Sequence, residues 1–346
     1  MPINIKNRIE AGIARFNKNL EAVFGLARIS PLLSKTIKEF IARKGKRIRP
    51  TLFVIGYMGY TKKPAQNLYS SALSLELLHN FMLIHDDIID KSALRRGLPS
   101  MHKTLDACLG THTHKKFNGQ DLAIVVGDIV YAMAIHAFLS IKEDWQRKEN
   151  ALKRFIEAAI YTGSGEFVEL LYGMKPLEEI KRSDIYKIYD LKTAHYTFCS
   201  PLVVGAVLAG AGKKEVSKLI RFGLCLGRAF QIKDDLLDMF GKEKEIGKSA
   251  LGDLKEGKKT LLLWHAYRNS TPKNKRYLNK VLAKNTLSGH DLLTIKKLVM
   301  YSGALDCLKD DIERLLRQAK AINACLAMRK EYKTLLAQVS SKLLAV

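Results

Sequence analysis

The segment ALSLELLHNFMLIHDDIID, residues 72–90, decides the fold class of this protein. Its apolar residues recur every three or four positions, which predicts a largely buried helix, and the run closes on three aspartates. Asp86 and Asp90 are four residues apart, so they lie on one helix face and repel each other unless a cation lies between them. A second segment, Asp234-Asp235-Leu236-Leu237-Asp238, repeats this arrangement after another apolar run.

The two acidic motifs have the donor chemistry of a magnesium site. Mg²⁺ prefers oxygen ligands and usually takes one or two carboxylates together with substrate phosphates and water. Basic residues follow each motif: Arg95-Arg96-Gly97 follows the first, and Gly247-Lys248 and Gly257-Lys258 follow the second. Two such helices facing each other would clamp one diphosphate, with metals and cations on its oxygens. The alternative for either motif alone is a solvated, charged helix end.

A third basic segment, Gly45-Lys46-Arg47-Ile48-Arg49-Pro50, precedes another apolar run and contains no carboxylate. By itself such a segment is usually only a soluble loop. Beside the acidic motifs it indicates a second anion pocket, which would bind a diphosphate without metal.

Helical periodicity dominates the rest of the chain, and no alternating strand pattern is evident. We therefore expect one all-α domain over residues 1–346, with its motif-bearing core at about 40–265. The segments with this periodicity are 32–42, 72–89, 122–140, 151–171, 183–198, 218–240, 260–267 and 305–344.

Composition narrows the class of protein. Residues 122–139 are almost long enough to cross a membrane, but Asp128 in their middle favours a buried core helix. No secretory signal is visible at the N-terminus, so a cytoplasmic location is expected. The five cysteines are scattered without a CxxC pair, which predicts reduced, mostly buried thiols rather than disulfides or a zinc site.

The net charge of +24 comes from 58 Lys and Arg against 34 Asp and Glu. The basic runs Lys142–Arg154 and Lys273–Lys284 are interpreted first as solvated helix faces. Weak contact with an anionic membrane surface is the second interpretation. No basic stripe with interleaved aromatic residues is present, so nucleic acid is not expected as a partner.

The sequence resembles the trans-isoprenyl diphosphate synthases, or polyprenyl synthetases, from about Lys46 to Leu262. It departs from their pattern at Leu262, where proline is common, and in a longer segment between His102 and Asp121. That segment adds His112 and His114, and we interpret it as a polar loop over the active-site mouth rather than a metal site. The motifs that carry the resemblance, in order, are GKRxRP at 45–50, ELLHxxxLIHDDxxD at 76–90, RRGxPSxH at 95–102, Gly127-Asp128, a GExxE-type segment at 165–169, KTA at 192–194, FQIxDDxxD at 230–238 and GKxxxxDxxEGKxT at 247–260.

The resemblance implies an isoprenoid-synthase-type bundle of about ten or more helices around a central apolar cavity. It also implies three Mg²⁺ per active site and a homodimer. Asp86 and Asp90 would ligate metal with Asp87 in support, and Asp234 would ligate the third ion. Asp235 and Asp238 would lie nearby or act through water.

The same resemblance implies roles for the basic and polar residues. The allylic diphosphate would be bound by Arg95, Lys192 and Lys258, with Lys248 close by, and the diphosphate of isopentenyl diphosphate by Lys46, Arg49, His79 and Arg96. Lys192, Thr193 and Gln231 would line the cationic centre. The alternatives are that His79 is a core histidine and that Thr193 bonds only its own helix.

The implied reaction is the head-to-tail (1′-4) condensation of isopentenyl diphosphate with dimethylallyl, geranyl or farnesyl diphosphate. Metal and cations would stabilise the departing diphosphate, which leaves an allylic carbocation. Rival hypotheses are a class I terpene cyclase and a non-catalytic prenyltransferase subunit. The all-aspartate second motif and the basic segment at 45–50 argue against the cyclase, and the complete set of aspartates argues against the subunit.

Product length is predicted from the helix that carries Asp86. Phe81 lies five residues before it, about 7.5 Å along the helix axis, where a ring would block the growing chain. Met82 is flexible and a weaker barrier, and Leu77 and Leu78 lie one turn deeper. One aromatic residue at this place resembles geranylgeranyl diphosphate synthases, which make a C20 product. A C15 or a longer product is the alternative, and Phe81 would then be ordinary core.

Overall fold

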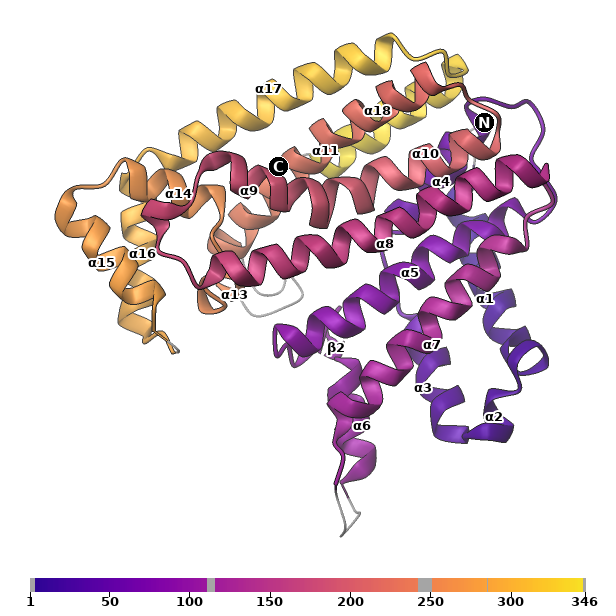
Figure 1. Cartoon of the computed structure of the whole chain (residues 1–346), viewed down its shortest axis with the longest axis horizontal. Coiled ribbons are helices and arrows are strands. Elements are labelled where there is room, and N and C mark those ends of the chain that lie inside the picture. The colour runs from indigo at the N-terminus through magenta and orange to yellow at the C-terminus, as the bar shows by residue number, and fades with distance from the viewer. Residues whose placement is uncertain (1–3, 111–115, 242–250, 285, 345–346) are drawn as a thin grey trace. The chain divides into compact units, whose positions relative to one another are not determined.

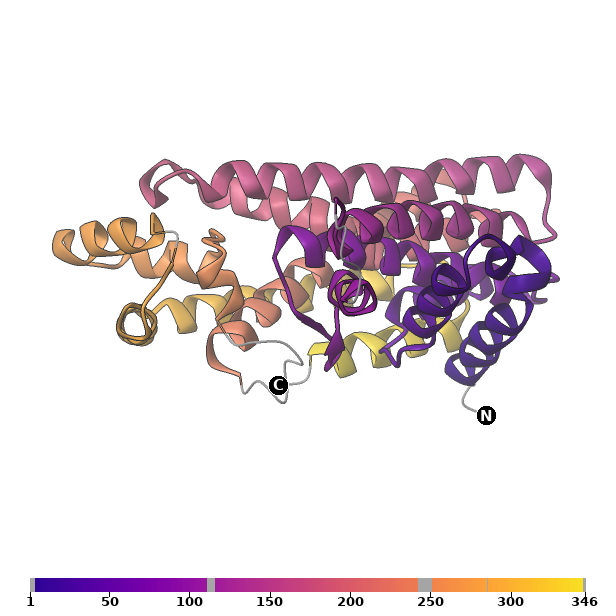
Figure 2. The same cartoon turned by 90° about the horizontal axis from the view of Figure 1, so that it is seen from below.

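The computed structural model describes residues 4–110, 116–241, 251–284 and 286–344. In these residues the regular secondary structure is helical apart from one small hairpin, so the predicted all-α fold is confirmed (Figures 1 and 2). Contacts divide the chain into two compact units, Met1–Leu152 with Val204–Gly210, and Lys153–Val203 with Ala211–Val346. The single domain over residues 1–346 stays a prediction.

The first unit is organised around α5 (Leu68–Ile89), which packs along α7 (Gly119–Leu139) and against α1 and α4. Leu73, Leu77 and Ile84 of α5 are buried, as the periodicity of its sequence predicts. The remaining elements of this unit are α1 (Ile5–Phe24), α2 (Leu26–Ile29), α3 (Pro31–Ala42), α4 (Ile48–Met58), β1 (Leu94–Arg95), β2 (Leu98–Pro99), α6 (Met101–Leu109) and the start of α8 (Trp145–Gly173).

Helix α7 contains the longest apolar stretch of the sequence. Among the described residues, α7 is the one helix whose length and apolar composition would allow it to cross a membrane. A core helix passes the same test, and α7 buries Val130, Ala134 and Phe138 while it packs along α5. This agrees with the predicted core helix.

The short hairpin of β1 and β2 was not expected from the sequence. Its turn residues, Arg96 and Gly97, have φ of 58° and 75°, the left-handed conformation that tight hairpin turns require. Such a conformation is unusual for arginine. The Arg96 side chain is held by the carbonyl of Arg43 at 3.3 Å and by Glu76 at 3.4 Å. The hairpin therefore directs both Arg95 and Arg96.

The second unit is built around α11 (Lys213–Phe240), which lies against η2 (Tyr189–Cys199) and α17 (Ala304–Ala324). The segment η2 is a π-helix that carries Lys192 and Thr193. The remaining elements are most of α8, η1 (Leu177–Glu179), α9 (Arg182–Ile188), α13 (Gly252–Lys255), α14 (Leu261–Arg268), α15 (Pro272–Leu282), α16 (Gly289–Tyr301) and α18 (Lys330–Leu344), while Ser200–Leu208 forms α10 across the unit boundary.

The helix expected over residues 305–344 is two helices, α17 and α18. The break is stabilised from α11. Lys218 donates to the carbonyl of Cys325 at 2.9 Å, and Glu215 accepts the N–H of Ala327 at 2.8 Å. The five cysteines are free as predicted, but only Cys199 is buried, so the expectation of mostly buried thiols was wrong.

Glycines bring α11 close to η2. A Cβ atom on Gly227 would lie 2.3 Å from the Cα of Ala194, and one on Gly223 would lie 2.8 Å from the backbone nitrogen of Cys199. Atoms that are not bonded to each other cannot lie this close, so a side chain at either glycine would force backbone to move. The glycines therefore set the separation between the helix that carries Gln231 and the π-helix that carries Lys192.

We predict that Gly227→Ala lowers the free energy of unfolding by about 1–3 kcal/mol, because the added methyl group must displace backbone. Gly163→Ala on α8 is the matched control. A Cβ there meets nothing within 4 Å, so alanine should raise stability by about 0.5–1 kcal/mol. Equilibrium denaturation measures both changes. Equal effects at the two positions would contradict the close-packing argument.

Candidate active site

The first acidic motif closes α5, and its three aspartates have different surroundings. Asp86 and Asp90 are half-buried, whereas Asp87 is 0% exposed. Nε of Arg95 donates to Oδ1 of Asp87 at 2.8 Å, and Nη2 of Arg95 lies 3.5 Å from Oδ2 of Asp86. Burial raises the pKa of Asp87 to about 6, although Arg95 opposes the shift. Asp87 is thus turned toward Arg95, and the supporting role expected for it stays a prediction.

The predicted second anion pocket gathers Arg49, Arg96 and His79 within the first unit. Burial, followed by the positive charges of Arg49 and Arg96, lowers the pKa of His79 well below its usual value, so its imidazole is neutral. A neutral imidazole can donate one hydrogen bond to an anion without adding to the crowding of cations. Lys46, the fourth expected residue of the pocket, is exposed.

Two residues of this pocket had no expected role. Arg47 is 2% exposed, forms an ion pair with Glu76, and donates from Nε to Glu10 at 3.0 Å. Glu76 is also buried and accepts from Arg96. Glu76 therefore neutralises cations that would otherwise repel one another. The sequence offered one signal, a lone acid inside an apolar run, but it could not show which arginine Glu76 meets.

The residues expected to limit product length lie on α5. Leu77 and Leu78 are 0% exposed, and Phe81 and Met82 are half-buried. The ring of Phe81 lies 4.9 Å from the ring of Tyr131 on α7 and 4.8 Å from that of His85. Tyr131 was not anticipated, because residues 50 positions apart come together only when α5 and α7 pack.

The second acidic motif also separates its aspartates. Asp234 is exposed, whereas Asp235 and Asp238 are 4% and 3% exposed. Asp238 accepts the backbone N–H groups of Gly252 and Asp253 at 3.3 and 3.1 Å. Asp235 accepts from the hydroxyl of Tyr189 and from Gln231, and burial raises its pKa well above the usual value. Of the three, Asp234 is the carboxylate that faces outward.

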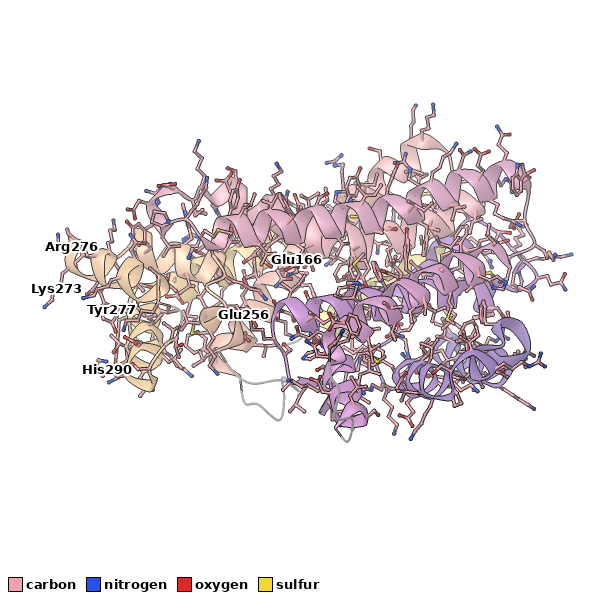
Figure 3. The ribbon with its side chains drawn as sticks, turned by 60° about the horizontal axis from the view of Figure 1, so that its bottom comes forward. Glu166, Glu256, Lys273, Arg276, Tyr277 and His290 are labelled. Atoms are coloured by element: carbon pink, nitrogen blue, oxygen red, sulfur yellow. The ribbon has the colours of Figure 1, made fainter. Side chains whose placement is uncertain are left out.

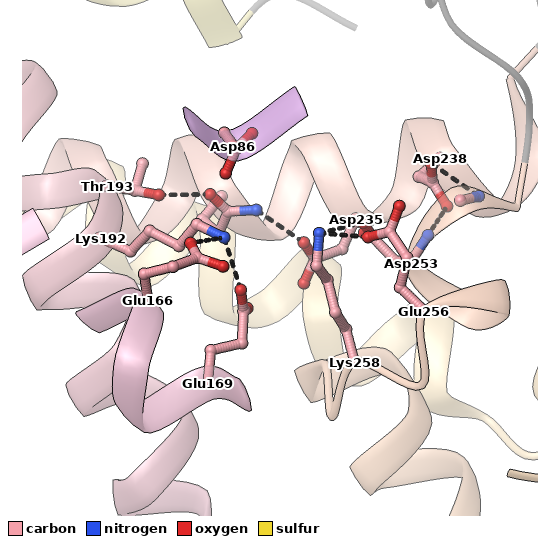
Figure 4. A network of polar contacts seen from close by, with 12 residues as sticks. Asp86, Glu166, Glu169, Lys192, Thr193, Asp235, Asp238, Asp253, Glu256 and Lys258 are labelled. Atoms are coloured by element: carbon pink, nitrogen blue, oxygen red, sulfur yellow. Dashed lines mark hydrogen bonds and ion pairs between the residues drawn. The ribbon is translucent and has the colours of Figure 1, made fainter. Parts of the chain in front are cut away.

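Polar side chains from η2, α8 and α11 converge in the second unit (Figure 4). The ammonium group of Lys192 is bound by Glu166 and by Glu169, the latter at 2.6 Å. The hydroxyl of Thr193 donates to Oε1 of Gln231 at 2.5 Å. Thr193 is thereby joined to Gln231, and Lys192 pairs with both glutamates of the GExxE-type segment. The role of these residues at a cationic centre stays a prediction.

Lys258 and His102 contact residues that are close to them in the sequence. Lys258 pairs with Glu256 at 2.5 Å and lies 3.7 Å from Asp253. His102 is buried, and its Nδ1 lies 3.3 Å from the hydroxyl of Ser100, which fits a core histidine. Lys248, His112 and His114 lie outside the described residues.

Comparison with known protein families identifies the family of this chain. The model of the polyprenyl synthetase family matches residues 30–299. The chain belongs to the polyprenyl synthetase family. It is therefore a prenyl diphosphate synthase, a transferase that condenses isopentenyl diphosphate with an allylic diphosphate, as the sequence analysis predicted.

Individual relatives differ in their named products. The chain is 30% identical to a short chain isoprenyl diphosphate synthase of Methanocaldococcus jannaschii, over 87% of this chain and 85% of that enzyme. It is 31% identical to a geranylgeranyl diphosphate synthase of Saccharolobus solfataricus, covering 72% and 70% of the two chains. It is also 31% identical to a geranylfarnesyl diphosphate synthase of Aeropyrum pernix, covering 84% and 86%.

A solved structure shows the same fold. A geranylgeranyl pyrophosphate synthase from Corynebacterium glutamicum, complexed with isoprenyl diphosphate and magnesium, superimposes with a TM-score of 0.89 at 24% identity. The match covers 99% of this chain and 98% of that chain. The isoprenoid-synthase fold is thus confirmed.

Proposed function

We propose that this prenyl diphosphate synthase makes geranylgeranyl diphosphate, the C20 product. The observation that carries the proposal is the Phe81 ring, supported on two sides by Tyr131 and His85. A ring wedged in this way resists displacement by a growing chain better than an isolated side chain does. The neighbouring Met82 has more rotatable bonds and yields more easily. The C15 and longer products, including the C25 product named for one relative, are the alternatives.

We infer that Mg²⁺ is the cofactor, with three ions per active site. Asp86 and Asp90 lie four residues apart at the end of α5, and neither is fully buried, so both can offer carboxylate oxygens to a metal. Asp234, which is exposed, supplies the corresponding oxygen from the second motif. Bound metal would supply Lewis acidity at the departing diphosphate. Support also comes from the magnesium in the structure of the Corynebacterium enzyme.

The protein's own groups would bind and orient the two substrates. Arg95, Lys192 and Lys258 would hold the allylic diphosphate, with Lys248 beside them. Lys46, Arg49, His79 and Arg96 would hold isopentenyl diphosphate. Each diphosphate carries several negative charges, which multiple cations can neutralise in advance of bond breaking.

The hydroxyl of Thr193 and the amide oxygen of Gln231 would face the developing allylic cation. Both oxygens carry partial negative charge that is fixed before reaction and therefore stabilises the cation without reorganisation. Apolar walls would exclude water, which otherwise captures the cation as an alcohol.

The first prediction from this proposal concerns product length. With Mg²⁺, isopentenyl diphosphate and dimethylallyl, geranyl or farnesyl diphosphate in turn, the enzyme should yield mainly the C20 product. Dephosphorylation and chromatography measure it. Phe81→Ala should shift the products to longer chains, whereas Met82→Ala should shift them less because the ring remains.

Other product distributions would contradict the proposal in different ways. A different dominant length, or an unchanged distribution in Phe81→Ala, would refute the C20 assignment while leaving the enzyme class intact. A cyclic product without condensation would instead support the terpene cyclase.

We further propose that the protein is a homodimer. Each unit exposes apolar side chains on a long helix, a feature that commonly marks an association surface. On α7 they include Ile124, Val125 and Leu139; on α8 they include Ile160, Phe167, Leu170 and Leu171.

Light scattering during gel filtration should give the mass of two chains of 39.0 kDa. Ile160→Glu combined with Phe167→Glu should give one chain. Leu293→Glu combined with Tyr301→Glu, on the equally exposed face of α16, should leave the dimer intact. A wild-type mass of a single chain at micromolar concentration would refute this proposal.

Weak contact with an anionic membrane surface is proposed for α15 and α16. Lys273, Arg276 and Lys280 are exposed at the i, i+3 and i+7 positions of α15, so they form one basic face. Lys273 and Arg276 point away from the body of the second unit (Figure 3). The neighbouring α16 exposes Leu293, Met300 and Tyr301, which can enter the lipid interface.

Co-sedimentation with vesicles tests this contact. Binding should require anionic lipid and weaken with added salt. Changing Lys273, Arg276 and Lys280 to Glu should abolish it, whereas the same changes at the exposed residues Lys213, Lys214 and Lys330 should weaken it far less. Equal losses in both variants would show that only net charge matters. The cytoplasmic location stays a prediction.

A further inference from the structure

We propose that Tyr189 is a positioning residue of this active site, which fixes Gln231 through Asp235. No role was expected of Tyr189 from the sequence. The proposal rests on the proposed role of Gln231 and Thr193 at the cationic centre and extends it to the groups that hold them in place.

The contacts form one continuous chain within the second unit. The Tyr189 hydroxyl donates to Oδ2 of Asp235. Oδ1 of Asp235 accepts from Nε2 of Gln231 at 2.8 Å, and Oε1 of Gln231 accepts from the Thr193 hydroxyl at 2.5 Å. Tyr189 and Asp235 are each 4% exposed, so water does not readily replace either partner.

This chain sets the orientation of the Gln231 amide. An amide has a donor end and an acceptor end that differ little in size, so only its hydrogen-bond partners decide which way it faces. Oδ1 of Asp235 accepts from the NH₂ group of Gln231, and this bond directs the donor end of the amide toward Asp235. The Gln231 oxygen is left on the side of Thr193, from whose hydroxyl it accepts a hydrogen bond, at the proposed cationic centre.

A phenol suits this position because it both donates and accepts. The Tyr189 oxygen accepts the backbone N–H of Leu261 at 3.0 Å while its proton goes to Asp235. Leu261 is the first residue of α14, whose N–H has no partner inside its own helix. One hydroxyl thus joins η2, α11 and α14, and phenylalanine could make neither bond.

The same contacts distinguish Asp235 from the aspartates that are expected to bind metal. Both of its oxygens already accept a hydrogen bond from a protein group, and the side chain is buried. Asp234, next to it in the sequence, is exposed. We therefore assign the metal-facing role of this motif to Asp234 and the positioning role to Asp235.

The variant Tyr189→Phe tests the proposal in the full-length enzyme. Loss of the hydroxyl frees Asp235 to turn, and the Gln231 amide then loses its fixed orientation. We expect kcat to fall about tenfold, less than the loss when a preorganised group is itself removed. The KM of each substrate and the Mg²⁺ concentration for half-maximal rate should change less than about twofold, because no contact to diphosphate or metal is lost.

Tyr186→Phe is the matched control. Tyr186 lies one turn earlier, and its hydroxyl donates to Asp311 at 3.2 Å rather than to the Gln231 network. This variant removes a half-buried tyrosine hydroxyl from a carboxylate in the same unit, and we expect kcat to stay within about twofold of the wild-type value.

A double-mutant cycle tests whether Tyr189 acts through Gln231. In a Gln231→Ala background, Tyr189→Phe should lower kcat by less than about threefold, because the group that it positions is already gone. Multiplicative losses in the two variants would overturn the proposal. An unchanged kcat in Tyr189→Phe would also overturn it, as would a marked rise in the Mg²⁺ requirement, since that would return Asp235 to the metal.

A readout independent of activity keeps this test separate from the proposed function. In protein labelled with ¹⁵N-glutamine, the side-chain NH₂ signal of Gln231 is assigned by its absence in Gln231→Ala. It should exchange slowly with solvent in the wild type and in Tyr186→Phe, and rapidly in Tyr189→Phe. Equal exchange in all three proteins would refute the positioning role even if no condensation product were formed.

Discussion

A carboxylate that leaves water must find hydrogen-bond donors, and this constraint governs both acidic motifs. The first motif buries one aspartate, Asp87, which is paired with Arg95. The second buries two: Asp235 is bonded to Tyr189 and Gln231, and Asp238 accepts two backbone N–H groups. An unpartnered buried carboxylate would cost several kcal/mol. The paired aspartates therefore stay inside, and their neighbours Asp86, Asp90 and Asp234 remain more accessible. The division between buried and accessible carboxylates follows from the desolvation of charge.

Cations that leave water are likewise balanced by carboxylates. Arg47 is almost fully buried, and Glu76 and Glu10 balance its charge, while Glu166 and Glu169 hold the ammonium group of Lys192. These pairs keep cations at fixed places without substrate. If a diphosphate binds at these cations, as proposed, it would compete with the glutamates for some of these contacts.

Close helix packing supplies the rigidity that such orientation needs. Gly223 and Gly227 let α11 lie close to the π-helix η2. Gln231 on α11 is thereby within hydrogen-bonding distance of Thr193 on η2. The hydroxyl of Tyr189 adds a polar link at the same junction and extends it to the start of α14. The enzyme thus positions neutral dipoles, in addition to charges, where the proposed carbocation would form. Dipoles that are held before reaction stabilise that charge at little entropic cost.

The sequence by itself determined the all-α fold, the two acidic motifs and the family, because helical periodicity and motif spacing are properties of residues close together in the chain. It placed Asp86 and Asp90 on one helix face, and the resemblance implied that Thr193 and Gln231 both line the cationic centre. Only the tertiary structure decided which aspartates of the two motifs are buried. It also decided that Phe81 packs on Tyr131 and that α17 ends where Lys218 and Glu215 bind the chain. The helix period fixes directions around one axis. The contacts of Tyr189 with Asp235, of Phe81 with Tyr131 and of α11 with the end of α17 join residues between 46 and 112 positions apart, and they arise only when separate helices pack.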